Sequence, residues 1–173
     1  MKKQFGAIIL VLIVGALFIA ENAVAQTKCK LVNVHMTEYT EEGGVETCGV
    51  EGWCGEGNLI GTFNGRLFTL GLDTETVYPF YDSVFWRGQS TIETKDGEIF
   101  AITSGVNLFR TWYTSGVSTA QESHAVTGGT GRYEGASGYI LMNYVFGDWD
   151  DESGMFITPS TGELTGQVCW PQE

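Results

Sequence analysis

Charged side chains inside predicted strands are the residues of this sequence most able to do chemistry. Alternation from Phe85 to Glu93 places Arg87 and Glu93 on one face of a single strand. Burying a polar group without a hydrogen-bond partner costs roughly 1–3 kcal/mol, so an inward-facing charge needs a partner or a ligand. We therefore predict Arg87 and Glu93 as candidate catalytic residues that act on a bound molecule. The alternative is that this face is the solvated outer surface.

Glu38 is the third candidate catalytic residue, and it lies near the end of the first predicted strand, Lys30 to Thr40. Strict alternation places His35 on one face of this strand and Glu38 on the other, together with Val32, Val34 and Met36. At most one of His35 and Glu38 then points inward, unless a bulge intervenes.

Further residues on neighbouring strands could contact a ligand. They combine amide, guanidinium and aromatic groups: Asn64, Arg66, Phe85, Asn107 and Tyr144. Aromatic residues make up 13% of the chain, enough to line an apolar pocket for a small hydrophobic molecule. Filling of a core, or of a contact between subunits, is the alternative.

Signatures of other active sites are missing. The sequence has no Gly-x-Ser-x-Gly elbow and no His-x-x-x-His pair, and its cysteine spacing fits no zinc pattern. We therefore expect no metal and no cofactor. The acidic turn Asp148 to Glu152 could attract calcium, but it lacks the glycine of an EF-hand loop, and we interpret it as a solvated turn.

The elements that must position these residues are strands, because no segment after residue 25 shows a helical apolar period. We expect a loop over Glu41 to Gly57, one long strand over Asn58 to Leu70 bent at Gly61 or Gly65, and a turn at Lys95-Asp96-Gly97. The other strands are expected at Val84–Thr94, Glu98–Arg110, Glu122–Thr127, Tyr139–Phe146, Met155–Thr158 and Leu164–Trp170. About eight strands with short polar turns predict an all-β antiparallel sandwich or barrel.

The stretch Ala125 to Ile140, AVTGGTGRYEGASGYI, contains five glycines. A phosphate-binding loop needs a helix after it, and β-rich sequence follows instead. We interpret the run as a glycine-rich bend between two strands, with its turn glycines at Gly128, Gly129, Gly131 and Gly135.

The run Ala125 to Gly135 resembles the Val-x-Gly-Gly-(Thr/Ser)-Gly-x-(Phe/Tyr) signature of the allene oxide cyclase and dirigent barrel families. The segments Gly61-Thr62-Phe63, Gln89-Ser90-Thr91-Ile92 and Asp96-Gly97 are similar in spacing to bacterial members. The resemblance implies a closed eight-stranded antiparallel β-barrel of calycin-like shape. It also implies a homo-oligomer, in particular a trimer.

In allene oxide cyclases an apolar barrel guides ring closure of an epoxide, and Glu38 stands roughly where those enzymes keep an acidic residue. The first functional hypothesis is nevertheless a barrel that binds or shelters a small hydrophobic molecule without chemistry of its own. The alternatives are an isomerase or cyclase of the allene oxide cyclase type, and a structural, oligomeric surface protein.

Residues 1–25 have the pattern of a signal peptide. Lys2 and Lys3 precede the apolar run Phe5 to Ala20, and Ala23-Val24-Ala25 is a small-x-small cleavage site. We expect cleavage after Ala25 and a secreted or periplasmic protein, with residues 26–173 as one barrel domain; an uncleaved membrane anchor is the alternative. The formal net charge of −12 argues against nucleic acid and anionic membrane as partners.

Four cysteines follow the predicted signal peptide: Cys29, Cys48, Cys54 and Cys169. An even count in an exported chain indicates disulfides, and three pairings are possible. Cys48 and Cys54 are close enough in sequence to close a small loop. Cys29 and Cys169 would then join the first and last strands, which are neighbours in a closed barrel.

Overall fold

The computed structural model describes residues 27–43, 45–49, 51–76, 83–108, 118–150, 155–156 and 158–172. The predicted signal peptide, its cleavage site and Arg110 lie outside the described residues. Within those residues, no helix has the length and apolar character needed to cross a membrane.

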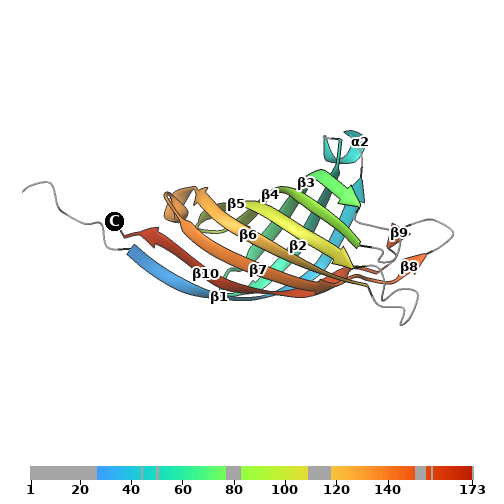
Figure 1. Cartoon of the computed structure of the whole chain (residues 1–173). Coiled ribbons are helices and arrows are strands. Elements are labelled where there is room, and N and C mark those ends of the chain that lie inside the picture. The colour runs from blue at the N-terminus through green and yellow to red at the C-terminus, as the bar shows by residue number, and fades with distance from the viewer. Residues whose placement is uncertain are drawn as a thin grey trace, which may run out of the picture.

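The chain forms a closed barrel of eight antiparallel strands in the order β1-β10-β7-β6-β5-β4-β3-β2 (Figure 1). The barrel strands are β1 (Thr27–Gly43), β2 (Trp53–Gly61), β3 (Gly65–Thr76), β4 (Ser83–Thr94), β5 (Gly97–Leu108), β6 (Thr119–Gly129), β7 (Ser137–Val145) and β10 (Ser160–Pro171). This architecture confirms the predicted fold class. A four-residue helix, α2 (Val45–Cys48), and a separate ribbon of β8 (Trp149–Asp150) and β9 (Met155–Phe156) lie at the opposite end of the barrel from the chain's C-terminus (Figure 1).

Two disulfides, Cys29–Cys169 and Cys48–Cys54, confirm the predicted pairing. Cys29 and Cys169 are directly opposite each other where β1 meets β10, with their Cα atoms 4.0 Å apart. This bridge therefore covalently joins the first and last strands where the barrel closes. The second bridge ties α2 to β2 at the other end. Disulfides of this kind fit an oxidising compartment such as the periplasm or the extracellular space.

Three predicted elements were wrong. The expected single strand Asn58–Leu70 is the hairpin of β2 and β3, because the chain reverses over residues 62–64, where Asn64 Oδ1 accepts a hydrogen bond from the Gly61 N–H at 2.9 Å. The expected loop Glu41–Gly57 is shorter, since β1 continues to Gly43 and β2 begins at Trp53. Residues Met155–Phe156 pair with β8 and not with a barrel strand.

A β-bulge in β1 reverses which side chains face the barrel interior. The pairing register shifts between Met36 and Tyr39 against β10, and between Thr37 and Thr40 against β2. Glu38 occupies the bulge with a φ of 55°, a left-handed conformation that is uncommon for a residue other than glycine. Val34 and Met36 face inward before the bulge, and Tyr39 faces inward after it. The prediction that Glu38 shares the inward face of Met36 was therefore wrong.

The glycine-rich stretch is the predicted bend between two strands. β6 ends at Gly129, a 3-10 turn follows over Gly131–Tyr133, and β7 begins at Ser137. Gly131 and Gly135 have φ values of 57° and 69°, which explains why the bend needs glycine there. Tyr133 folds inward from this bend.

The end of the barrel nearest the C-terminus is filled by aromatic rings. Tyr133 packs edge-to-face against Phe63 and Trp170, with ring centroids 5.9 and 5.4 Å away. Aliphatic side chains, including those of Val32, Val168 and Leu67, continue the core from there. The interior near this end is therefore apolar, whereas the half toward β8 and β9 contains polar groups.

Candidate ligand site inside the barrel

Polar side chains from six strands gather in the barrel interior, on the half toward β8 and β9. We call this set the polar cluster; its members are Tyr39, Glu41, Thr69, Ser90, Thr103, Glu122, His124 and Tyr144. All of them are buried except Glu41, which is half-buried. Because carboxyl, imidazole, phenol and hydroxyl groups meet here inside the barrel, the cluster is the candidate functional site.

Strand alternation explains why Glu122 and His124 face inward. In β6, buried and exposed residues alternate, and the buried series is Ala120, Glu122, His124 and Val126. Thr103 of β5 lies directly opposite His124, so its hydroxyl reaches the same layer of the interior. Burial of Ala120 and Val126 determines which face of β6 points into the barrel. Glu122 and His124 lie between them on the same face and therefore also point inward.

The imidazole of His124 is held at one nitrogen by two hydroxyl groups. Its Nδ1 lies 2.8 Å from Ser90 Oγ and 3.0 Å from Thr103 Oγ1, and these two oxygens are 2.8 Å apart. Its Nε2 lies 3.2 Å from Glu122 Oε2, although the approach is not aligned as a hydrogen bond. The carboxylate favours the tautomer with the proton on Nε2, with Nδ1 accepting from a hydroxyl.

A second pair in the cluster joins β1 to β7. The Tyr144 hydroxyl donates a hydrogen bond of 2.7 Å to Glu41 Oε1. Burial raises the pKa of Glu41 to about 8, the Tyr144 hydrogen bond lowers it, and the nearby Glu122 raises it again. Burial also raises the pKa of Tyr144 well above its usual range, and the Glu41 and Glu122 carboxyls contribute in the same direction.

Tyr39 stands between these two pairs. Burial raises the pKa of its phenol well above the usual range, and the charges of Glu122 and Glu41 raise it further, while the Thr69 hydroxyl lowers it. The Tyr39 ring packs edge-to-face on Tyr144 at 5.3 Å. Because the same two carboxyls act on both phenols, the cluster is one electrostatic unit and not a set of isolated groups.

Several buried atoms of the cluster make no aligned hydrogen bond: Tyr39 Oη, Thr69 Oγ1, His124 Nε2 and both carboxyl oxygens of Glu122. Their neighbours are one another, because the Thr69 hydroxyl acts on Tyr39 and His124 Nε2 lies 3.2 Å from Glu122 Oε2. The four residues are each at most 3% exposed. An orphaned buried donor or acceptor costs about 1–3 kcal/mol, and more when charged. These atoms therefore favour an occupant that hydrogen-bonds with them.

Inward-facing glycines give large aromatic rings room beside the cluster. A Cβ atom at Gly55 would overlap the Tyr39 hydroxyl, and one at Gly105 would overlap the Trp86 ring. Trp86 packs edge-to-face on the half-buried Trp53 at 4.6 Å and donates a 3.3 Å hydrogen bond to Asn107 Oδ1. The wall of the site is therefore aromatic as well as polar.

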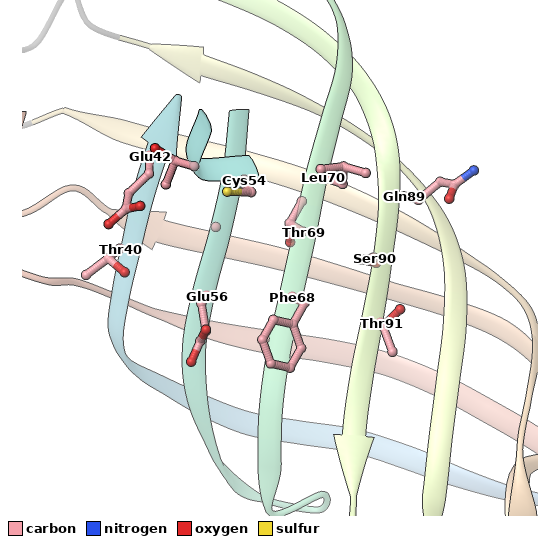
Figure 2. Close-up of a pocket in the computed structure, with 12 residues that line it drawn as sticks. Thr40, Glu42, Cys54, Glu56, Phe68, Thr69, Leu70, Gln89, Ser90 and Thr91 are labelled. Atoms are coloured by element: carbon pink, nitrogen blue, oxygen red, sulfur yellow. The ribbon is translucent and has the colours of Figure 1, made fainter. Parts of the chain in front are cut away.

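Two hollows lie along the barrel wall. One of about 440 Å³ runs over β1–β4; Figure 2 shows its lining, with outward residues such as Glu56 and Phe68 and the cluster members Thr69 and Ser90. The other, of about 820 Å³, runs from Asp73 across β4–β7 and includes Glu122 in its lining. Both hollows thus adjoin the strands that carry the cluster.

The three predicted catalytic residues lie on the outer face of the barrel. Arg87 and Glu93 do share one face of β4, as alternation predicted, but both are exposed. Glu38 is exposed on its bulge, where its Oε2 accepts a short 2.5 Å hydrogen bond from Asn58 Nδ2. His35 is also exposed and pairs with Glu163 at 2.7 Å. The structure brings none of these side chains into the polar cluster.

The five predicted ligand-binding residues divide between the two faces. Asn64 lies in the exposed turn between β2 and β3, Phe85 is exposed on β4, and Arg66 stacks over Phe68 at 4.8 Å and pairs with Glu56 on the outer face. Asn107 and Tyr144 are buried in the interior. Tyr144 belongs to the polar cluster, and Asn107 anchors the adjacent Trp86.

Sequence reasoning did not single out most of the cluster. Glu122 and His124 had a usable signal, because they stand between Ala120 and Val126 in perfect alternation. Tyr39 and Glu41 had no such signal in the sequence, because only the bulge in β1 points their side chains into the barrel. Ser90 and Thr103 are small hydroxyl residues of a kind common on both faces of a sheet.

Among the described residues, no three His, Cys, Asp or Glu side chains are grouped so that they could hold a metal ion. A scan against protein-family models finds no match to this sequence, and a search of the curated proteins finds none either.

Proposed function

We propose that this protein binds a small molecule inside its barrel, with a polar group of that molecule at the polar cluster. The observation that carries the proposal is the set of buried atoms without an aligned hydrogen bond on Tyr39, Thr69, Glu122 and His124. An eight-stranded barrel has an interior that can hold one small ligand. A ligand that hydrogen-bonds to these atoms would remove their desolvation cost.

The surroundings favour a ligand with an apolar body. Met142 lies directly opposite Glu122 on β7 and is fully buried, and Met36 lies near the Tyr39 ring. Methionine and aromatic side chains adapt to irregular apolar shapes. This agrees with the sequence-based hypothesis of a hydrophobic ligand and adds a polar group to it. Export through the predicted signal peptide would place the protein where it meets such a molecule outside the cytoplasm.

Native mass spectrometry of the protein purified from its own source tests the proposal. We expect a non-covalent adduct of defined mass in the wild type. Tyr39→Phe removes one unpartnered oxygen and should lower the fraction that carries the adduct, whereas Glu134→Gln, on the exposed bend, should leave it unchanged. Absence of any adduct in fresh wild-type preparations would contradict the proposal.

A second candidate function is an isomerase or cyclase that acts on an apolar substrate in the same place. The observation that favours it is a carboxyl, an imidazole and a phenol within one buried cluster. Glu122 could take a proton while Tyr39 or Tyr144 donates one, and the enclosed wall would hold a single substrate conformer. His124 would position and polarise the Glu122 carboxyl.

Turnover of a panel of unsaturated epoxides and ketones separates this candidate from binding alone. An enzyme should lose at least about 100-fold in kcat with Glu122→Gln, while Glu93→Gln on the outer face should not change kcat. If the wild type binds panel members but does not turn them over, the result would support the binding function and contradict the enzyme candidate.

A further inference from the structure

In the part of the chain that the structure describes, the polar cluster contains two carboxyl groups and neither a lysine nor an arginine. Glu122 and Glu41 both place carboxyl groups in the polar cluster. Within the described part of the chain, every lysine and arginine is exposed: Lys28, Lys30, Arg66, Arg87, Lys95 and Arg132. The only basic side chain in the cluster is His124. An occupant of the cluster therefore meets carboxyl groups without a permanent cation beside them.

The unpartnered atoms are mostly acceptors. The two Glu122 oxygens can only accept when the carboxyl is ionised, and the Tyr39 and Thr69 hydroxyls can accept as well as donate. Glu122 and Tyr39 interact electrostatically, as do Glu41 and Tyr39. A primary ammonium group brings three N–H donors and a positive charge, which match an ionised carboxylate and two neighbouring hydroxyls.

The aromatic side chains beside the cluster also favour a positively charged ligand. Rings of Tyr39, Tyr144 and Trp86 line this half of the interior. The face of an aromatic ring attracts a cation, and the attraction is stronger where water is excluded. An anionic ligand would meet the Glu122 carboxylate and the electron-rich ring faces, which both repel it. A neutral alcohol would supply one donor where the cluster offers several acceptors.

We propose that the ligand is a small primary amine, bound as the ammonium ion on an apolar body, with the ammonium between Glu122, Tyr39 and Thr69. This inference depends on the proposed binding function and specifies its ligand class. The apolar body would lie along Met142 and the aromatic wall.

Isothermal titration calorimetry with three probes of similar size tests the ligand class. The probes are 2-phenylethylamine, 2-phenylethanol and 3-phenylpropanoate, titrated into the wild-type protein at pH 7. We expect the amine to bind roughly 10- to 100-fold more tightly than the alcohol, as hydrogen bonds to charged groups predict, and the carboxylate to bind most weakly. Equal or tighter binding of the alcohol or the carboxylate would overturn the amine assignment.

Two variants connect the preference to the cluster. Glu122→Gln keeps the shape of the side chain but removes its charge, and it should abolish the preference for the amine over the alcohol; the exposed Glu134→Gln should keep it. If Glu122→Gln fails to fold, Thr69→Val is the second variant, and it removes one hydrogen-bond acceptor. It should weaken binding of the amine several-fold and weaken binding of the alcohol less. An unchanged preference in the folded variants would contradict the assigned position of the ammonium.

The test distinguishes the two levels of the proposal. Binding of the alcohol without preference for the amine would contradict the amine class and leave the binding function standing. If no probe binds, the adduct seen by native mass spectrometry decides: an amine supports the inference, and a neutral or acidic molecule overturns it. Absence of both probe binding and adduct would contradict the binding function itself.

Discussion

Replacing Glu41 by glutamine is expected to remove much of the pH dependence of folding stability near neutrality. Burial raises the pKa of the Glu41 carboxyl from 4.5 to about 8, with an opposing contribution from the Tyr144 hydrogen bond and a further rise from Glu122. Between these two values, the folded protein keeps a proton at Glu41 that the unfolded chain has released. The free energy of unfolding must therefore fall as the pH rises through this window.

The magnitude follows from the size of the pKa change. A rise from 4.5 to about 8 corresponds to at most about 5 kcal/mol, at about 1.4 kcal/mol per pH unit. Glu41 as a residue is only half-buried, so we expect solvent to reduce the effect to about 2–4 kcal/mol. Tyr39 and Tyr144 share the cluster, but their pKa values are raised from 10, and neither contributes between pH 5 and pH 9.

Urea unfolding at a series of pH values from 5 to 9, with both disulfides intact, measures this effect. Glutamine at position 41 does not titrate and still offers an oxygen to the Tyr144 hydroxyl. We expect the wild type to lose about 2–4 kcal/mol between pH 5 and pH 9, Glu41→Gln to lose much less, and the exposed Glu134→Gln to match the wild type. Parallel stability curves for Glu41→Gln and the wild type would refute the assignment of a protonated, buried Glu41.

Three further predictions concern the cluster and the strands that hold it. Tyr39→Phe should stabilise the ligand-free protein by about 1 kcal/mol, because it removes a buried hydroxyl that makes no aligned hydrogen bond, whereas Tyr144→Phe should destabilise it by about 1–3 kcal/mol, because it leaves Glu41 without its donor; urea unfolding measures both, and equal effects would contradict the partner assignment. Replacing Cys29 and Cys169 together by serine should cost about 4–5 kcal/mol, since their bridge spans 140 residues; an unchanged thermal midpoint would argue against it. Glu38→Gly should raise stability by up to about 1 kcal/mol because glycine accepts a φ of 55°, and a loss would mean that the Asn58 hydrogen bond outweighs the strain.

The barrel fold was predictable because the residue types at several of its turns favour a reversal of the chain. The glycines of the bend after β6 and the Lys95-Asp96-Gly97 turn each demand a reversal at a fixed place, and both appear where expected. The pairing of Cys29 with Cys169 followed from closure of the barrel. By contrast, the reversal between β2 and β3 was hidden, because the segment around it continues to alternate like one strand.

Most of the site was not predictable, because the strand-pairing register decides which side chains point into the barrel. Nothing in the residue types around Glu38 requires a bulge, yet the bulge exchanges the faces of every later residue in β1 and brings Tyr39 inward. In β7, Tyr139, Ile140, Leu141 and Met142 are apolar on both faces, so their alternation carries no signal. Only structure shows that Arg87 is outside while Glu122 is inside.

A high-resolution crystal structure of the protein purified from its own source tests most directly whether a bound molecule occupies the polar cluster. We predict electron density for a bound molecule within hydrogen-bond distance of Glu122 and of the Tyr39 hydroxyl. Side chains that bond only to one another, with no density between them, would contradict it.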